Sequence, residues 1–290
     1  MIAPDRDRLL RACPEPFLIV GVGGMLARAF QETLDALRIR HTGVTQAELD
    51  ITDADAVLRR VREPVVINCA AWTNVDGAEQ DEAGATAVNG RGIEHLRDAC
   101  FESEGLLVNF GTDYVFNGNG TRPYKVGDPL EPLNAYGRSK AAGERALAHM
   151  LDYLHVRTSW LYAPWGNNFV RTIARLLRER PSIRVVNDQR GRPTSAEHLA
   201  RATLALLQAG ARGIVHATDG GECTWYEFAG QIGRLTGATG TVEPCTTAEF
   251  PRPARRPAYS VLDISETERL IGPMPDWKAN LAEVVARLEI

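Results

Sequence analysis

Lysine is the basic residue that this chain almost lacks. Among its 33 lysines and arginines, only Lys125, Lys140 and Lys278 are lysines. Long blocks of like charge are missing as well, and the formal net charge of -4 offers no basic surface to a polyanion. We therefore expect no nucleic-acid partner, and each of the few lysines becomes a candidate for a special role.

Paired cysteines and long apolar runs are also missing. The five cysteines are scattered singly, and their odd number and spacing argue against a disulfide framework and a zinc site. The early apolar run over residues 17–26 is interrupted by three glycines, so it is neither a signal peptide nor a membrane span. These absences predict a cytoplasmic protein without a membrane segment, and we interpret residues 1–15 as a loosely held extension.

Short apolar runs alternate with longer helical patterns in the first half of the chain. The patterns predict strands at residues 17–20, 41–45, 65–68, 106–110 and 154–157, with helices at about 24–38, 77–103 and 135–150. Strands that alternate with helices of this length indicate right-handed β-α-β crossovers. The predicted fold class is therefore α/β, with a doubly wound parallel sheet of the Rossmann type.

A glycine-rich turn follows the first predicted strand. Gly21, Gly24 and Ala27 form a G-x-x-G-x-x-A spacing that leads into a helical pattern. Glycines let the backbone approach a pyrophosphate, whose charge is stabilised by free N–H groups at the helix N-terminus. Packing alone also produces such turns, and Glu48 and Asp50 come late for the acid that should bind the adenosine ribose. The choice between NADH and NADPH stays open.

Tyr136 and Lys140 lie four residues apart in a predicted helix, so their side chains share one face. An ammonium beside a phenol favours the phenolate, and we expect it to lower the pKa of Tyr136 toward the range of a general acid. A compact ammonium suits that contact better than the arginine fork. This spacing is often only structural, but Thr112 follows the fourth strand at the sheet edge where ligands bind, which favours a catalytic group.

Several longer segments resemble one known family, the extended short-chain dehydrogenases/reductases. The similarity runs from about residue 17 to 288 and includes residues 68–79, 111–120, 132–140, 157–162, 166–169, 186–194 and 251–257. The resemblance implies an NAD(P)-binding Rossmann domain over residues 16–160. It also implies a smaller C-terminal substrate-binding lobe over residues 161–290, some of whose elements return to the Rossmann sheet.

The resemblance also implies roles for single residues. The catalytic group would be Thr112, Tyr136 and Lys140. The cofactor-binding residues would be Gly21, Gly24, Met25, Leu26, Asp50, Ile51, Ala70, Ala71, Trp72, Tyr136 and Lys140. The substrate-binding residues would be Thr112, Asp113, Trp160, Asn168, Gln189 and Arg256.

Some positions depart from the family pattern. Ala27 replaces the usual third glycine, and Trp72 stands where relatives often carry a smaller side chain or a histidine. Some relatives bind magnesium at a dimer interface through acidic side chains; Glu197 resembles one of them, but Ala29 supplies no carboxylate at the other, so we expect no metal. Asp76 and Glu79 we interpret as a helix capping box rather than as paired catalytic carboxylates.

The resemblance implies an enzyme, a monomer or homodimer, that uses NADPH or NADH to reduce the C4 keto group of a dTDP-linked 4-dehydro-6-deoxy sugar. The expected reaction converts dTDP-4-dehydro-L-rhamnose to dTDP-L-rhamnose. A related 4-ketoreductase, epimerase or 4,6-dehydratase would share the same motifs, although Tyr114 stands where such dehydratases carry a glutamate. A non-catalytic regulatory binding subunit is the third interpretation, although the chain keeps Thr112, Tyr136 and Lys140 together.

Overall fold

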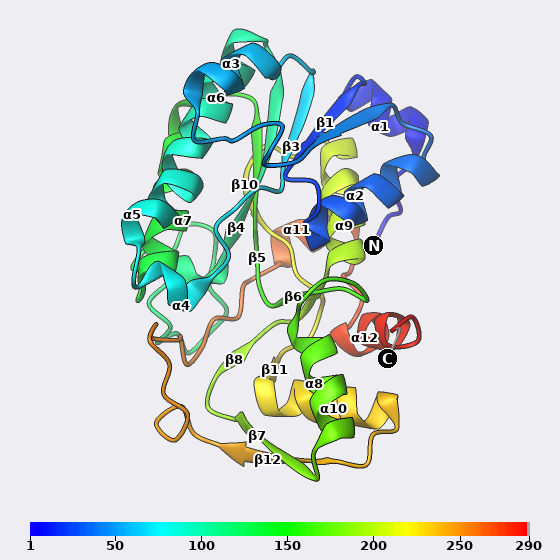
Figure 1. Ribbon diagram of the computed structural model, residues 1–290. Helices are drawn as coiled ribbons and strands as arrows, with labels where there is room; N and C mark the ends of the chain where they lie inside the picture. The colour runs from blue at the N-terminus through cyan, green and yellow to red at the C-terminus, as the bar shows by residue number, and fades with distance from the viewer. Residues whose placement is uncertain (289–290) are drawn as a thin grey trace.

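A central sheet of six parallel strands organises the computed structural model, which describes residues 1–288 (Figure 1). The strands follow the order β10-β5-β4-β3-β1-β2. Their bounds are β1 (Phe17–Val20), β2 (His41–Val44), β3 (Val65–Asn68), β4 (Leu106–Thr112), β5 (Tyr153–Thr158) and β10 (Gly213–His216). Every residue of β1, β3 and β4 is buried, as expected for a parallel sheet covered on both faces. The predicted doubly wound parallel sheet is confirmed.

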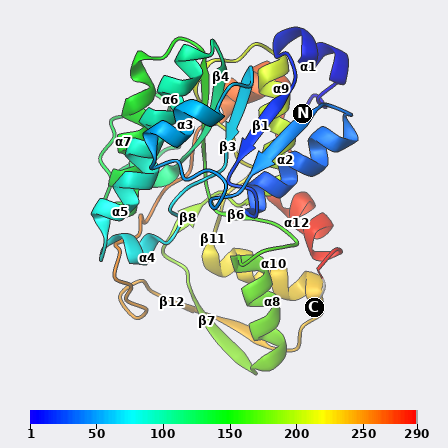
Figure 2. The same cartoon turned by 45° about the horizontal axis from the view of Figure 1, so that its top comes forward.

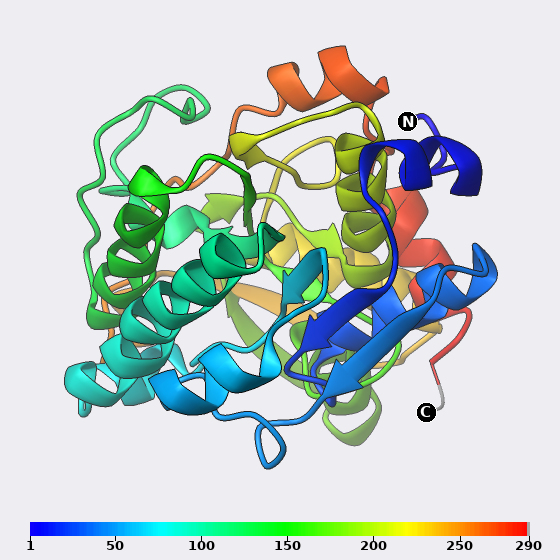
Figure 3. The ribbon, with the colours of Figure 1, turned by 90° about the horizontal axis from the view of Figure 1, so that it is seen from above.

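Helices cover both faces of this sheet, as the view from above shows (Figure 3). On one face, Phe17 and Ile19 pack with α2 (Met25–Ala36) and α9 (Ala196–Gln208). On the other face, Leu18 and Val20 pack with α3 (Ala54–Arg60) and α6 (Gly92–Glu102). This division follows from the alternation of side chains along a strand. The helix α7 (Ala135–Ala146) lies beside α6, and α11 (Ser265–Ile271) lies beside α9.

The N-terminal segment is part of the core, so the prediction of a loose extension is wrong. Residues Arg6–Ala12 form α1, whose N-cap Asp5 accepts a hydrogen bond from the backbone N of Arg8 at 3.0 Å. Leu9 is fully buried, and α1 packs against α9. The apolar residues of this short segment are spaced to form one helical face, and the partner helix comes from a distant part of the chain, which a local pattern does not reveal.

The predicted continuous helix over residues 77–103 is broken into pieces. They are α4 (Val75–Ala78), α5 (Glu82–Thr86), a π-helical segment (Ala87–Arg91) and α6. The side chains of Asn74 and Asp81 each cap a new helix start, accepting hydrogen bonds from the backbone N of Gly77 at 2.9 Å and of Gly84 at 2.8 Å. These side-chain caps favour new helix starts over one continuous helix. The sequence pattern also failed to predict the short helix α3.

A second layer of elements lies below the sheet in Figures 1 and 2. Its centre is the parallel pair β7 (Ser182–Val186) and β12 (Thr241–Cys245), packed against α10 (Trp225–Thr236) and α8 (Phe169–Glu179), with α12 (Trp277–Val285) beside α10. The remaining short strands are β6 (Leu161–Tyr162), β8 (Arg190–Gly191), β9 (Thr194–Ser195) and β11 (Cys223–Thr224). Although they belong to the second half of the chain, α9 and β10 lie in the sheet layer. The division near residue 160 stays a prediction.

None of the helices in residues 1–288 combines the length and the apolar character needed to cross a bilayer.

Candidate active site

The chain reverses its direction of winding at β1, and the main cleft opens there. From β1 the chain passes to β2 on one side, and then crosses to β3 on the other side. In doubly wound sheets, ligands bind at the carboxyl ends of the strands beside such a switch point. A cavity of about 610 Å³ lies at this place. Among the predicted site residues, those that line it are Gly24, Met25, Leu26, Ala70, Ala71, Thr112, Asp113, Tyr136, Lys140 and Trp160.

The glycine turn after β1 brings the ends of two strands close together beside the cavity. Gly21 has a φ of +87°, and a Cβ at this position would lie 2.6 Å from the backbone N of Ala70, so only glycine lets the ends of β1 and β3 approach this closely. Gly24 is the N-cap of α2 and supplies no side-chain hydrogen bond, and it lines the cavity together with Met25 and Leu26. The start of α2 thus borders the cavity, and the free N–H groups of a helix N-terminus are suited to bind an anion such as a pyrophosphate.

Tyr136 lies in the first turn of α7, and the N-cap of α7 and two distant segments fix that turn. The N-cap Asn134 accepts a hydrogen bond from the backbone N of Gly137 at 2.8 Å and donates one to the backbone O of Arg255, also at 2.8 Å. Glu79 accepts a hydrogen bond from the backbone N of Ala135 at 2.7 Å. Residues far apart in the sequence therefore position the phenol at the cavity.

The prediction of a capping box formed by Asp76 and Glu79 is wrong. Asn74, not Asp76, is the N-cap of α4. Asp76 forms an ion pair with Arg256 at 2.9 Å and accepts a hydrogen bond from the backbone N of Ala254 at 3.2 Å. Because Glu79 binds the start of α7, both carboxylates serve contacts between segments rather than the start of their own helix.

Burial dominates the proton affinity of the tyrosine and the lysine, so the predicted lowering of the Tyr136 pKa is wrong. Burial raises the pKa of Tyr136 to about 12; the charge of Asp113 adds to this, and a hydrogen bond with Thr112 opposes it. Burial lowers the pKa of Lys140 to about 8, opposed by the charge of Glu144. The Nζ atom of Lys140 donates to the backbone O of Phe110 at 2.6 Å, so this ammonium is directed at a carbonyl as well as at the cavity.

Thr112 and Asp113 form a connected polar pair at the end of β4. The Oγ1 atom of Thr112 donates to Oδ1 of Asp113 at 3.1 Å and accepts from the backbone N of Tyr114 at 3.2 Å. Burial raises the pKa of Asp113 to about 7, opposed by the nearby hydroxyls of Ser260 and Thr112. Among the described residues, Oδ2 of Asp113 has no hydrogen-bond partner although it is buried. A buried carboxyl oxygen of this kind is available to a ligand hydroxyl.

The sequence patterns missed several residues of the cavity wall. Asn68 ends β3 and Cys69 follows it, Ser159 follows β5, and Trp225 begins α10. A sequence signal existed for Trp225, because Thr224 and Glu227 form a capping box that marks the start of a helix. Tyr114 also lines the cavity, and its ring meets the Tyr136 ring edge-on with centroids 5.9 Å apart.

The other predicted site residues lie outside the described lining of this cavity. Asp50 accepts a hydrogen bond from the backbone N of Thr52 at 2.9 Å. Asn168 caps α8 through the backbone N of Arg171. The full set comprises Gly21, Asp50, Ile51, Trp72, Asn168, Gln189 and Arg256. Their ligand-binding roles stay predictions.

Two of these residues donate side-chain hydrogen bonds to groups outside the described lining of the cavity. The Nε2 atom of Gln189 donates to Oγ1 of Thr247 at 2.9 Å, and Nε1 of Trp72 donates to the backbone O of Asn74 at 2.9 Å. Glu197, the residue that resembles a magnesium ligand of some relatives, accepts a hydrogen bond from Arg287 at 2.5 Å.

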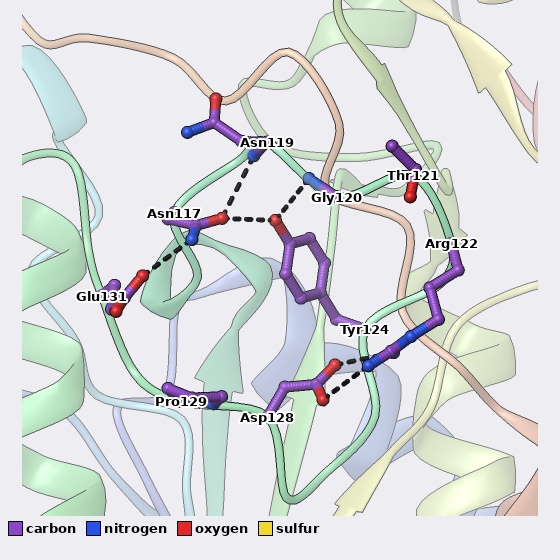
Figure 4. A pocket seen from close by; sticks show the side chains of 9 residues that line it. All are labelled: Asn117, Asn119, Gly120, Thr121, Arg122, Tyr124, Asp128, Pro129 and Glu131. Atoms are coloured by element: carbon purple, nitrogen blue, oxygen red, sulfur yellow. Dashed lines mark hydrogen bonds and ion pairs between the residues drawn. The ribbon is translucent and has the colours of Figure 1, made fainter.

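A smaller cavity of about 320 Å³ lies in the loop between β4 and α7 (Figure 4). The hydroxyl of Tyr124 donates to Oδ1 of Asn117 at 2.7 Å, and Arg122 binds both carboxylate oxygens of Asp128 at 2.9 Å. Asn117 in turn donates to Glu131 at 2.7 Å. Since these polar groups already bind one another, we assign the network to the shape of the loop that precedes α7.

Comparison with known proteins identifies relatives along nearly the whole chain. The model of the family described as the RmlD substrate binding domain matches residues 16–290. A dTDP-4-dehydrorhamnose reductase of Streptomyces griseus is 44% identical over 285 residues, which cover 93% of this chain and 93% of that protein. A dTDP-4-keto-6-deoxy-D-glucose reductase of Streptomyces niveus is 40% identical over 274 residues, which cover 92% of this chain and 95% of that protein.

Among solved structures, the crystal structure of dTDP-4-dehydrorhamnose reductase from Bacillus anthracis str. Ames in complex with NADP is similar to this fold. Its TM-score is 0.89 at 36% sequence identity, and the similarity covers 93% of this chain and 98% of that chain.

Proposed function

The chain belongs to the RmlD substrate binding domain family, and we propose that it is an oxidoreductase that reduces dTDP-linked 4-keto-6-deoxy sugars with NADPH or NADH. The observation that carries this proposal is the meeting of the glycine turn with Thr112, Tyr136 and Lys140 in one cavity. Relatives that match most of the chain are named as reductases of such sugars, and one related structure contains NADP.

Each of the polar residues in the cavity has a separate role in the proposed reduction. When bound, the nicotinamide supplies the hydride that attacks the C4 carbonyl. Tyr136 donates its phenolic proton to the oxygen that becomes a hydroxyl, and its raised pKa keeps it protonated at neutral pH. When its hydroxyl turns from Oδ1 of Asp113 toward the cavity, Thr112 donates its single proton to the same oxygen and thereby stabilises its developing negative charge. Asp113 accepts from a sugar hydroxyl through Oδ2.

Two parts of the cavity would bind the cofactor. The N-terminus of α2 and the turn before it would bind the pyrophosphate, because a Cβ at Gly21 would block the approach of β3 and the cap of α2 lacks a competing side chain. Lys140 would bind ribose hydroxyls with the protons of Nζ that the backbone O of Phe110 does not accept.

The substrate that we propose is dTDP-4-dehydro-L-rhamnose, giving dTDP-L-rhamnose. The Streptomyces niveus relative supports dTDP-4-keto-6-deoxy-D-glucose as the second candidate. Elimination of water is less well supported, because the residue after Asp113 is Tyr114, whose pKa is raised by burial, so the site lacks a carboxylate base there.

The test is to incubate the protein with dTDP-4-keto-6-deoxy-D-glucose, with and without a 3,5-epimerase, and to add NADPH or NADH. We expect cofactor oxidation only after epimerisation, with dTDP-L-rhamnose as the product identified by chromatography and NMR. Oxidation without the epimerase would favour the second candidate. If neither NADPH nor NADH is consumed, with or without the epimerase, the proposed activity is contradicted.

We also propose a cytoplasmic monomer or homodimer without a nucleic-acid partner. The five cysteines support a reducing compartment, because all are free thiols and four of them are buried.

A further inference from the structure

Trp160 has a backbone conformation that is rare for a bulky residue. It lies two residues after the end of β5, its φ is +47°, and its side chain lines the main cavity. A left-handed conformation is costly for an aromatic residue, so it persists only where the surroundings enforce it. At a cavity wall, such strain indicates that the position of the side chain matters.

Two contacts enforce the position of the Trp160 side chain. The Trp160 ring stacks on the ring of Trp225, with centroids 3.6 Å apart and planes inclined by 11°. On the backbone of β8, a Cβ at Gly191 would lie 2.6 Å from Cε2 of Trp160, so a side chain there would displace the indole. The backbone O of Trp160 also accepts a hydrogen bond from the backbone N of Thr194 at 3.2 Å.

Trp225 is itself held firmly. It is the first residue of α10 and lies within the capping box in which Thr224 and Glu227 each bind the other's backbone N. The ring of Phe169 packs on it with centroids 4.5 Å apart. Trp225 lines the same cavity as Trp160, so the stacked pair connects α10 to the segment that follows the carboxyl end of β5.

We propose that Trp225 is a positioning residue: its ring holds Trp160 in the left-handed conformation and so fixes the aromatic wall against which the sugar of the substrate is placed. The inference rests on the proposed function. An indole face packs well against the C–H groups of a deoxy sugar, and a wall that shifts would misplace the carbonyl relative to Thr112 and Tyr136.

The test compares Trp225→Leu with Trp225→Phe. We expect Trp225→Leu to raise KM for the dTDP-sugar by roughly tenfold or more, because the wall loses its support, while KM for the nicotinamide cofactor stays unchanged. Trp225→Phe keeps an aromatic face and should recover most of the sugar affinity. The exciton signal of the stacked indoles in far-UV circular dichroism should disappear in both variants.

The matched control is Trp277→Leu, the same substitution at a second tryptophan. Trp277 belongs to the hydrophobic cluster against which Trp225 packs. Trp277 is buried and packs edge-on against Phe228, outside the described lining of the cavity. We expect this variant to unfold at a lower temperature than the wild type but to keep its KM for the dTDP-sugar. The contrast separates positioning from general loss of packing.

An unchanged sugar KM in Trp225→Leu, or an equal rise in Trp277→Leu, would overturn the inference. Failure of the wild type to reduce any 4-keto sugar would instead overturn the proposed function. Calorimetric binding of dTDP-L-rhamnose needs no turnover and applies to every variant. Weaker binding by Trp225→Leu alone supports the positioning role, and equal binding by wild type and Trp225→Leu contradicts it.

Discussion

At the scale of single residues, Tyr136 and Lys140 show opposite consequences of burial. Both have their charged forms disfavoured, so the pKa of the phenol rises to about 12 and that of the ammonium falls to about 8. The sequence spacing correctly indicated that both side chains reach one cavity. It did not reveal the degree of burial, which depends on residues distant in the chain, and this is why the predicted direction of the Tyr136 shift was wrong.

The pKa of Lys140 predicts an alkaline limit to activity. Lys140 is charged below about pH 8 and loses its proton as the pH rises above that value, so kcat/KM should fall there. Lys140→Arg stays charged and should lose this alkaline limb, although its broader side chain will lower the overall rate. The measurement is the pH profile of kcat/KM for both proteins.

Asp113, whose pKa is raised to about 7, faces Thr112, Ser260 and Tyr136 and adds its own inflection to the pH profile of kcat/KM. Comparison with Asp113→Asn separates the two groups, since only the inflection near pH 7 should vanish. An alkaline limb near pH 8 that persists unchanged in Lys140→Arg would contradict the assignment to Lys140.

At the scale of elements, the alternation of strands and helices was predictable because each buried strand is a short apolar run. The predicted strands at residues 17–20 and 65–68 match β1 and β3. The interruptions between residues 75 and 102 were not predictable from periodicity, because polar side chains such as Asn74 and Asp81 start new helices there. The roles of Asp76 and Glu79 depend on partners more than fifty residues away, and local spacing cannot identify those partners.

The cap of α7 predicts a link between helix geometry and catalysis. Asn134→Ala removes the hydrogen bonds to the backbone N of Gly137 and the backbone O of Arg255, and we expect a loss of about 1 to 2 kcal/mol in the free energy of unfolding. Because Tyr136 lies in that first turn, kcat should fall as well. Urea denaturation and steady-state kinetics measure the two effects.

The matched control is Asp53→Ala, which removes the N-cap of α3 outside the described lining of the cavity. It should lower stability by a similar amount and leave kcat unchanged. A kcat for Asn134→Ala equal to that of the wild type would show that the cap does not position the phenol.

At the scale of the whole molecule, the site forms where the sheet meets the second layer of elements. Gly24, Thr112 and Tyr136 come from the sheet layer, whereas Trp225 comes from α10. The sequence predicted the sheet side well, because its motifs are local turns and strand ends. The other side depends on how α10 packs, and the same kind of distant contact holds α1 against α9.

The burial of α1 predicts that the N-terminal segment stabilises the fold without taking part in catalysis. Leu9→Ala should lower the free energy of unfolding by about 2 to 5 kcal/mol, the usual cost of truncating a fully buried leucine. Steady-state kinetics at a temperature where the variant is folded should give an unchanged kcat. A loss of less than about 0.5 kcal/mol by urea denaturation would indicate that α1 is not docked as described.

The most direct test of the proposed chemistry compares NADPH oxidation by Tyr136→Phe and Tyr114→Phe with the 4-keto sugar. Both changes remove one phenolic hydroxyl from the same cavity, and the two rings contact each other. If Tyr136 donates the proton, Tyr136→Phe should lose roughly 10² to 10⁴ in kcat while Tyr114→Phe keeps most of its activity. Near-wild-type turnover by Tyr136→Phe would contradict the account.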